Sequence, residues 1–297
     1  MERRYVIADV FTDTAFQGNP VAVVIEAEGL NKDEMQRIAV EFGYSETTFV
    51  FPPESKSNTA RVRIFTPSRE IPFAGHPNIG TAFVLAQEAL ASGQQPPQTL
   101  LFEEAAGLVP VRLISENNLI VGAELTAPEG LTLGSEVSPA NIAACLSLKS
   151  DEVITARHLP RVASVGLPFL FVELRSRDAL RRCVPNLQGF QATLPLDGAV
   201  SIYAYTRDVA ADADDQLEAR MFTPRMTEDP ATGSAAAALT ALLATLAHKE
   251  TLVLHISQGV DMGRCSRLST SYDSTSGREI VRVGGKAVTV MADTLNL

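Results

Sequence analysis

The sequence predicts an α+β protein made of two related halves, each with a sheet wrapped around one central apolar helix. Three observations lead to this prediction: strand-like segments outnumber helical ones, two helical segments carry almost no charge, and one long stretch occurs twice. The chain has 297 residues, of which 45% are hydrophobic and 20% charged. These are the proportions of an ordinary globular protein of one or two domains.

Short apolar segments, typical of β-strands, occur along the whole chain. The segment ARVRIF (60–65) alternates apolar and polar residues, as a half-buried strand should. The full set of predicted strands is 4–10, 21–25, 46–51, 60–65, 99–103, 108–114, 118–125, 167–174, 199–205, 218–222, 251–256 and 278–285.

Helical patterns are fewer and of two kinds. Residues 31–42 predict a surface helix, with Asn31 as its N-cap and Gly43 just past its end. Residues 77–90 have no charge before Glu88, and residues 234–247 have none at all. A helix that is apolar all round must be buried on all sides, so we expect each to be enclosed by a sheet.

An internal repeat is the strongest feature of the sequence. RIFTPSREIPFAGHPNIGTAFVLA (63–86) resembles RMFTPRMTEDPATGSAAAALTALLA (220–244), and each copy ends in one of the two apolar helices. We therefore predict two halves, residues 1–127 and 128–297, with 286–297 allowed to return to the first half. The turn-rich stretch 126–141 is interpreted as the linker, and the acidic cluster at 212–215 as a solvated loop.

The matched turns before the two apolar helices predict an anion site. The first turn of a helix offers unpaired N–H groups and a positive dipole end. His76 stands just before Pro77 in one copy, and Gly233 and Ser234 take the equivalent place in the other. The structural alternative is that both helices are merely well capped and buried.

Three side chains near these turns are candidates for acid/base chemistry. We expect His76, at a helix N-terminus, to be a neutral imidazole that donates or accepts a hydrogen bond. Asp229 lies in the matching turn, where it could equally hold the loop through backbone amides. Glu46 begins an apolar strand, which often raises a carboxyl pKa, although a surface position would suit it as well.

Other function classes are excluded by composition and by missing motifs. The net charge of −10 argues against nucleic acid and membrane as partners. Nucleotide-binding loops, zinc-protease motifs and CxxC pairs are absent, so we expect no cofactor and no metal. Cys145 and Cys183 are interpreted as buried small side chains. Without an apolar leader segment, the expected location is the cytoplasm.

The sequence resembles the PhzF-like phenazine biosynthesis proteins, which share the diaminopimelate epimerase fold. The stretches that carry the resemblance are DVFTDTAFQGNPVAVV (9–24), GYSETTFV (43–50), FTPSREIPFAGHPNIGTA (65–82), GLPFLFVEL (166–174), MFTPRMTEDPATGSAA (221–236) and ISQGVDMGRCS (256–266). The resemblance implies two mostly antiparallel, barrel-like domains, an active site between them, and a homodimer.

The resemblance also implies roles for individual residues. The acid/base glutamate of the family falls on Glu46 in S-E-T, and its active-site histidine falls on His76 in G-H-P. Its aspartate and serine fall on Asp229 and Ser234 in D-P-A-T-G-S. A further substrate contact is expected at Asn19, in G-N-P.

Two glycines distinguish between the chemistries that this fold supports. Gly75 and Gly233 stand at or near the places where the amino-acid epimerases carry their two catalytic cysteines. The leading hypothesis is therefore a cofactor-free isomerase that moves a proton between carbons of a small anionic metabolite. In the family, the named reaction is isomerisation of trans-2,3-dihydro-3-hydroxyanthranilate. The alternatives are an amino- or hydroxy-acid racemase or epimerase, and a non-catalytic binder of small anions. Cys265 replaces a usual proline, and its role is left open.

Overall fold

The computed structural model describes residues 2–210 and 216–297, so the acidic cluster at 212–215 lies outside the described residues. The chain forms two compact units. Unit 1 contains the residues up to Leu125 together with Gly284–Leu297, and unit 2 contains Thr126–Val283. The sequence placed the first boundary after residue 127 and allowed the last segment to return to the first half; the returning segment starts at Gly284.

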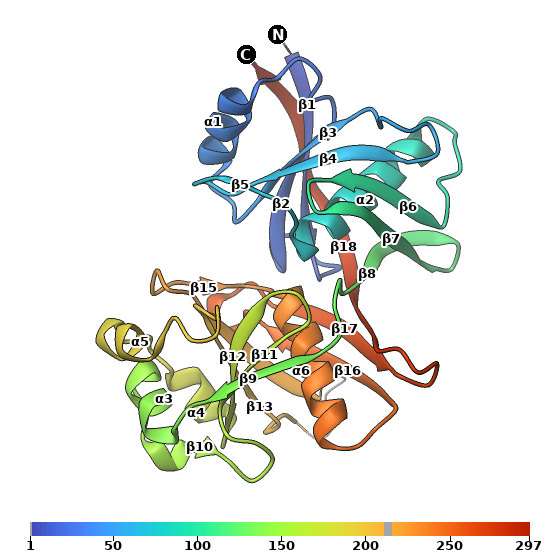
Figure 1. Ribbon diagram of the computed structural model, residues 1–297. Coiled ribbons are helices and arrows are strands. Elements are labelled where there is room, and N and C mark those ends of the chain that lie inside the picture. Colours follow the sequence, from blue (N-terminus) through green and yellow to red (C-terminus); the bar gives the residue numbers. More distant parts are fainter. Residues whose placement is uncertain (1, 211–215) are drawn as a thin grey trace. The chain divides into compact units, whose positions relative to one another are not determined.

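Unit 1 is a closed barrel around one helix (Figure 1). The strands pair in the ring order β18-β1-β2-β3-β4-β6-β7-β8, and β8 pairs with β18 to close it. Their bounds are β1 Glu2–Val10, β2 Asn19–Val24, β3 Thr47–Phe51, β4 Ala60–Phe65, β6 Thr99–Glu104, β7 Gly107–Glu116, β8 Leu119–Thr126 and β18 Ile280–Asn296, with the short β5 Glu70–Ile71 beside β4. Helix α2 (Gly75–Ala91) fills the barrel, and α1 (Lys32–Phe42) packs outside it.

Unit 2 repeats this order around helix α6 (Gly233–Leu246). The pairs run β9-β11-β12-β13-β14-β16-β17, and each pair has the same parallel or antiparallel sense as its counterpart in unit 1. The bounds are β9 Thr132–Glu136, β11 Arg161–Ser164, β12 Pro168–Leu174, β13 Ile202–Thr206, β14 Leu217–Phe222, β16 Thr251–Gln258 and β17 Ser266–Asp273. The remaining elements are β10 Val153–Ile154, β15 Glu228–Asp229, α3 Pro139–Leu146, α4 Arg177–Arg182, α5 Leu187–Thr193 and the 3₁₀ turns η1 Ser150–Glu152 and η2 Val260–Met262.

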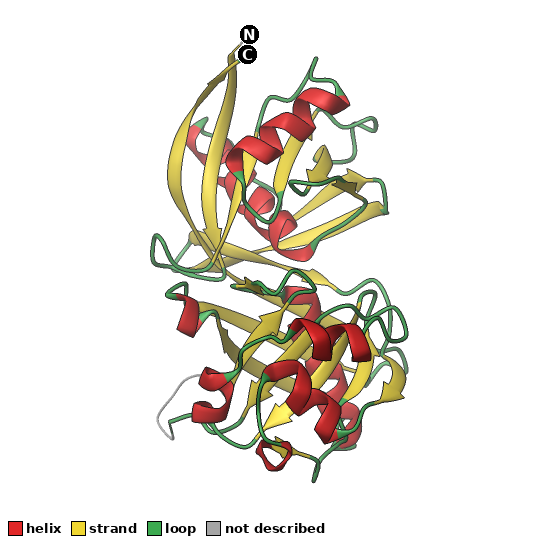
Figure 2. Cartoon of the chain, turned by 90° about the vertical axis from the view of Figure 1, so that its left-hand side faces the viewer, coloured by secondary structure: helices red, strands yellow, loops and turns green. Residues whose placement is uncertain are grey.

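The architecture predicted from the sequence is confirmed. The segment interpreted as a linker, 126–141, instead contains regular secondary structure. The stretch 126–141 contains β9 and the beginning of α3, whose N-cap is Ser138. Gly134 lies inside β9, and Pro139 is the first residue of α3. The sequence patterns also missed the barrel strands β11 and β17, the two-residue strands β5, β10 and β15, and the helices α3, α4 and α5, which are short or lack a clear period. Figure 2 shows both red central helices enclosed by yellow strands.

Small residues and paired hydroxyls let the barrel walls approach the central helices. A Cβ atom at Gly80 would lie 2.4 Å from Val21 Cγ1 and 2.9 Å from Val10 Cγ2, so the wall of β1 and β2 touches the helix backbone. The hydroxyls of Thr48 and Thr81 lie 2.8 Å apart, which joins β3 to α2. In unit 2, the hydroxyls of Thr240 and Thr270 join α6 to β17 at 2.6 Å.

The repeated R-x-F-T-P motif forms the same clamp in both units. Arg63 donates two hydrogen bonds to Glu70, at 2.6 and 2.8 Å, and its guanidinium lies over the ring of Phe65. Arg220 pairs with Glu228 in the same two-pronged way and lies over Phe222. Each clamp ties a barrel strand to the short strand that leads into the central helix, so it fixes the turn between them.

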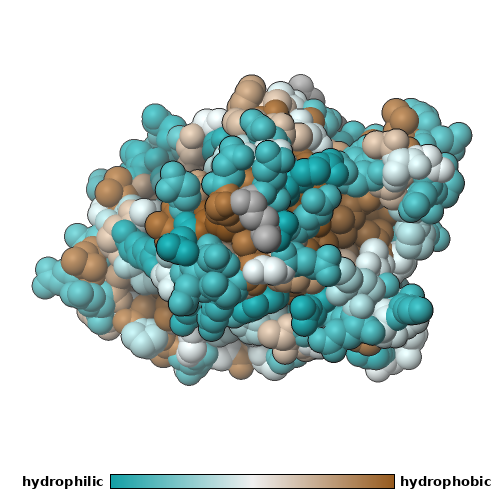
Figure 3. All heavy atoms as spheres, turned by 90° about the horizontal axis from the view of Figure 1, so that it is seen from above, coloured by the Kyte–Doolittle hydropathy of each residue, from teal (hydrophilic) through white to brown (hydrophobic). Residues whose placement is uncertain are grey.

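Figure 3 shows one face of the molecule, on which hydrophilic residues predominate and hydrophobic ones occur both in recessed areas and at the rim. Among the helices that the structure describes, none has the length and apolarity needed to span a bilayer.

Gly80→Ala is expected to lower the free energy of unfolding by about 1–3 kcal/mol, because the new methyl group overpacks the contact with Val21 and Val10. Chemical denaturation of the variant would measure this loss. The control is Gly80→Ala combined with Val21→Ala, which makes room for the methyl group. The double variant should lose less than the sum of the two single losses; simple additivity would contradict the packing explanation.

Candidate active site

The first turn of α2 lies at one end of the unit 1 barrel, together with the ends of several strands. Thr81 in the second turn bonds Thr48, so the first turn of α2 lies beside the beginning of β3. β2 is parallel to β3, and β6 is antiparallel to it through β4, so β2 and β3 begin toward the end of the barrel at which β6 ends. These strand directions place Asn19 and Glu46 toward the end of the barrel where α2 starts, and Glu104 reaches Asn78 in the first turn of α2.

Glu46 and His76 meet at this end. Nδ1 of His76 lies 3.4 Å from Oε2 of Glu46; 7% of the imidazole and 17% of the carboxyl side chain are exposed. They are 30 positions apart in the sequence, and the sequence could not show that they are neighbours. Nε2 of His76 is buried and has no hydrogen-bond partner among the described residues. The imidazole thus faces the Glu46 carboxyl through Nδ1.

Burial lowers the pKa of His76 to about 4, and the Pro20 carbonyl offsets this only partly. The imidazole is therefore neutral near pH 7, which agrees with the state predicted from the sequence. The cause differs, because desolvation is the largest effect, whereas we expected it to be the helix N-terminus. A neutral imidazole has one N–H and one lone pair, so by changing tautomer it can face Glu46 as carboxylate or as carboxylic acid.

In unit 2, Asp229 is held against the start of α6. It is half-buried and ends β15. The hydroxyl of Thr232 donates a 2.6 Å hydrogen bond to Asp229 Oδ2. The buried amide of Gln258 contacts both residues, and Tyr203 donates to the same amide at 3.0 Å. Burial and the charge of Asp229 raise the pKa of Tyr203 well above its usual range, so its phenol stays protonated.

The central helices start without the side-chain caps that the outer helices have. Side chains of Asn31, Ser138, Ser176 and Asn186 cap α1, α3, α4 and α5. Within the described part of the chain, neither α2 nor α6 receives such a cap, from Ala74 or from Thr232. Their first-turn amides are therefore available to another acceptor.

The remaining predicted residues lie in these first turns or beside them. Gly75 and Gly233 are the first residues of α2 and α6, and Ser234, which follows Gly233, is half-buried. A Cβ atom added at Gly75 would meet no described heavy atom within 4 Å, so there is open space in front of that residue. Asn19 is fully buried at the beginning of β2.

Sequence reasoning missed two equivalent residues, Glu104 and Gln258. Each is the last residue of the strand that follows a central helix. Phe102 pairs with Ala60, and Ile256 pairs with Leu217, at matching places in the repeat. In both strands the side chains point alternately into and out of the barrel. Phe102 and Ile256 point inward, and so do the polar residues two positions later, Glu104 and Gln258. A polar side chain at the next core-facing position was the signal that could have found them.

Glu104 differs from Gln258 in being titratable. Both its carboxyl oxygens are buried without a hydrogen-bond partner among the described residues, as are both polar atoms of the Asn78 side chain in the first turn of α2. Burial raises the pKa of Glu104 to about 8, and Asn78 lowers it only in part. Near pH 7 the group is a neutral carboxylic acid, which has nearly the shape of the amide at the equivalent position.

The cysteines and a surface groove carry no comparable chemistry. Cys145 and Cys183 are buried, as predicted, and burial raises the pKa of both thiols. Cys265 is partly buried in the loop before β17. In residues 2–210 and 216–297, His, Cys, Asp and Glu form no group of three that could hold a metal ion.

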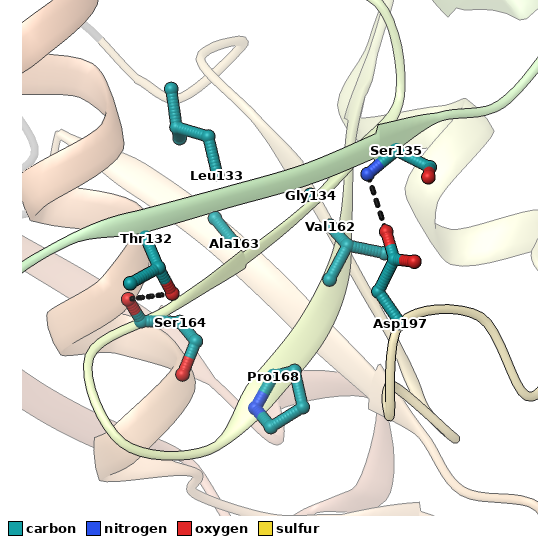
Figure 4. A pocket seen from close by; sticks show the side chains of 9 residues that line it. All are labelled: Thr132, Leu133, Gly134, Ser135, Val162, Ala163, Ser164, Pro168 and Asp197. Atoms are coloured by element: carbon teal, nitrogen blue, oxygen red, sulfur yellow. Dashed lines mark hydrogen bonds between the residues drawn. The ribbon is translucent and has the colours of Figure 1, made fainter.

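Figure 4 shows a groove of about 670 Å³ on unit 2, lined by β9, β11 and their neighbours. Its carboxylate, Asp197, accepts a hydrogen bond of 2.5 Å from the backbone amide of Ser135. This bond lowers the pKa of Asp197. The carboxylate thus joins its own loop to β9 and has a structural role. The groove contains none of the residues predicted for the site.

Glu104→Gln is expected to flatten the dependence of stability on pH. The folded-state pKa of about 8 exceeds the ordinary value of 4.5, so the folded state holds a proton that the unfolded chain releases. Stability contributed by this proton is present below pH 4.5 and is lost as the pH rises toward 8, by roughly 1.4 kcal/mol for each unit of difference.

The measurement is the free energy of unfolding of Glu104→Gln and of the parent protein at pH 5 and pH 9. The parent should lose a few kcal/mol more than the variant between these values. Glu103→Gln, on the same strand, is the control, because hydrogen bonds lower the pKa of Glu103 below its ordinary value. Equal slopes for the parent and Glu104→Gln would contradict the assignment.

Comparison with known proteins agrees with this architecture. Residues 8–293 match the family described as phenazine biosynthesis-like protein. The chain is 35% identical over 290 residues to trans-2,3-dihydro-3-hydroxyanthranilate isomerase of Pseudomonas aeruginosa, with 95% of each chain covered. It is 37% identical over 300 residues to an uncharacterized isomerase of Mesorhizobium japonicum, with 97% of each covered.

A solved structure extends the agreement to the fold. The PhzF-family protein of Bacillus anthracis superposes with a TM-score of 0.87 at 24% identity, and the whole of both chains is covered. The match over nearly all of this chain, and the two relatives at 35% and 37% identity, establish its relationship. The chain belongs to the phenazine biosynthesis-like (PhzF) family and is an isomerase.

Proposed function

We propose that this protein is a cofactor-independent isomerase that moves a proton between two carbons of a small, carboxylate-bearing metabolite. The observation that carries the proposal is the contact between Glu46 and a neutral His76 beside an uncapped helix N-terminus. The family relationship supports a ring substrate such as trans-2,3-dihydro-3-hydroxyanthranilate, on which the Pseudomonas relative is named to act.

Glu46 is the proposed acid/base. As a carboxylate it removes a proton from one carbon, and the double bond shifts as the electron pair moves. The same carboxyl then returns the proton to another carbon, so atoms and charge balance and no external oxidant or reductant takes part. His76 is neutral because it is buried, and it contacts Glu46 without gaining charge, whether Glu46 is a carboxylate or an acid.

The helix N-termini are the proposed anion sites. First-turn amides near Gly75 in α2 and near Gly233 in α6 offer donors to a carboxylate or to the negative charge that develops during proton transfer. Ser234 adds a hydroxyl donor, Asp229 orients the substrate, and Asn19 stays a proposed contact. These local donors explain how a chain with a net charge of −10 could bind an anion.

A two-base racemase or epimerase fits the turns less well. Such an enzyme of this fold would need a thiol at each turn, where this chain has Gly75 and Gly233. The three cysteines lie elsewhere in the sequence, and Cys145 and Cys183 are buried thiols with raised pKa values, poorly suited to act as bases.

Glu46→Gln is expected to reduce isomerisation roughly 10²- to 10⁴-fold, because the amide keeps the shape of the side chain and cannot carry the proton. NMR of the product formed in D₂O would follow both turnover and the origin of the transferred hydrogen. Glu88→Gln, on an exposed part of the same unit, is the control and should keep the parent rate. A Glu46→Gln enzyme with parental turnover would rule out the role of Glu46.

We also propose that the protein is a cytoplasmic homodimer, on the basis of the family relationship. Light scattering coupled to size-exclusion chromatography should then give about twice the chain mass of 31.8 kDa. A single species at the chain mass would contradict the dimer. Fractionation of the source cells would test the location.

A further inference from the structure

The amide of Gln258 has only one orientation that satisfies its neighbours. The backbone N–H of Thr232 lies 3.1 Å from Oε1, and the backbone carbonyl of Asp229 lies 2.8 Å from Nε2. A backbone N–H can only donate and a carbonyl can only accept, so a flipped amide would place donor against donor and acceptor against acceptor. Two main-chain groups therefore fix which end of the side chain is oxygen.

This orientation determines the direction of every other hydrogen bond in the cluster. Oε1 also receives the phenol proton of Tyr203 at 3.0 Å. The second N–H of Nε2 is donated to the hydroxyl of Thr232 at 3.1 Å. That hydroxyl, having accepted, gives its own proton to Asp229 Oδ2 at 2.6 Å. Gln258 is fully buried, and both its donors and both its acceptor positions are used.

Thr232 is the N-cap residue of α6, yet its hydroxyl does not cap the helix. A threonine at this position would ordinarily accept from an amide of the first turn. Here the side chain donates to Asp229, so the usual stabilisation of the helix start is given up. The Thr232 hydroxyl therefore binds Asp229 and does not cap helix α6.

We propose that Gln258 and Thr232 are positioning residues: the directed chain from Tyr203 through Gln258 and Thr232 holds Asp229 in one rotamer, with Oδ2 as an acceptor. Asp229 then acts as a fixed negative group that orients substrate, and proton transfer stays with Glu46. The inference rests on the proposed function of Asp229.

This network of hydrogen bonds also explains why two different residues, Gln258 and Glu104, occupy equivalent places in the repeat. Gln258 must donate and accept at once to order the turn before α6. The residue of unit 1 equivalent to Asp229 is Ile71, which has no side-chain acceptor to orient. No amide is needed there to order the turn, and Glu104 occupies the equivalent position.

The test compares Thr232→Val with Thr232→Ser, using the isomerisation assay, thermal unfolding and crystal structures of both variants. Valine has the shape of threonine without the hydroxyl, and serine restores the hydroxyl. Thr232→Val should lower kcat roughly 10- to 100-fold and release the Asp229 rotamer, and Tm should fall as well, because one buried N–H of Gln258 loses its acceptor. Thr232→Ser should recover the rotamer and most of kcat.

Two further variants separate the possible explanations. Thr240→Val removes another buried hydroxyl from α6, one that is not hydrogen-bonded to Tyr203, Gln258, Thr232 or Asp229. This variant should lower Tm while leaving kcat unchanged. Asp229→Asn tests the proposed function itself. If it keeps the parent kcat while Thr232→Val still displaces the Asp229 side chain, the positioning stands and the catalytic role falls. If Thr232→Val keeps both the rotamer and kcat, the positioning proposal is overturned.

Discussion

A central helix enclosed by a sheet imposes the constraint on which both units depend. Its sides must be apolar, and they must be small where a strand approaches as closely as Val21 approaches Gly80. Its ends cannot be covered in the same way, because a barrel is open at its ends. The amide donors of the first turn are therefore the polar groups that the fold leaves for another molecule, and the candidate residues gather around them.

The two units meet this constraint with one plan and different side chains. The arginine–glutamate clamp and the hydroxyl pair between helix and wall occur in both units. The groups at the helix starts have diverged: unit 1 carries Glu46 with a neutral His76, whereas unit 2 carries a carboxylate held by Thr232. Structural parts of the repeat are conserved between the halves, and chemical parts are not.

This division suits a reaction that needs one mobile proton. A group that exchanges protons needs a neighbour that tolerates both of its states, which a neutral imidazole does. A group that orients charge needs a neighbour that enforces one state, which a directed hydroxyl donor does. The surroundings of Glu46 and Asp229 differ in this way, although both side chains are half-buried carboxyls near a helix start.

The two-fold repeat, the apolar helices and the turns before them could be predicted from the sequence, because composition and periodicity are local properties of each segment. Motifs also indicated Glu46, His76 and Asp229. The contact between Glu46 and His76, the neutralisation of His76 and Glu104 by burial, and the hydrogen bond from Gln258 to the Asp229 turn became visible in the three-dimensional structure. These facts depend on strand register and on desolvation inside a closed barrel, which join residues far apart in the chain and leave no local pattern in it.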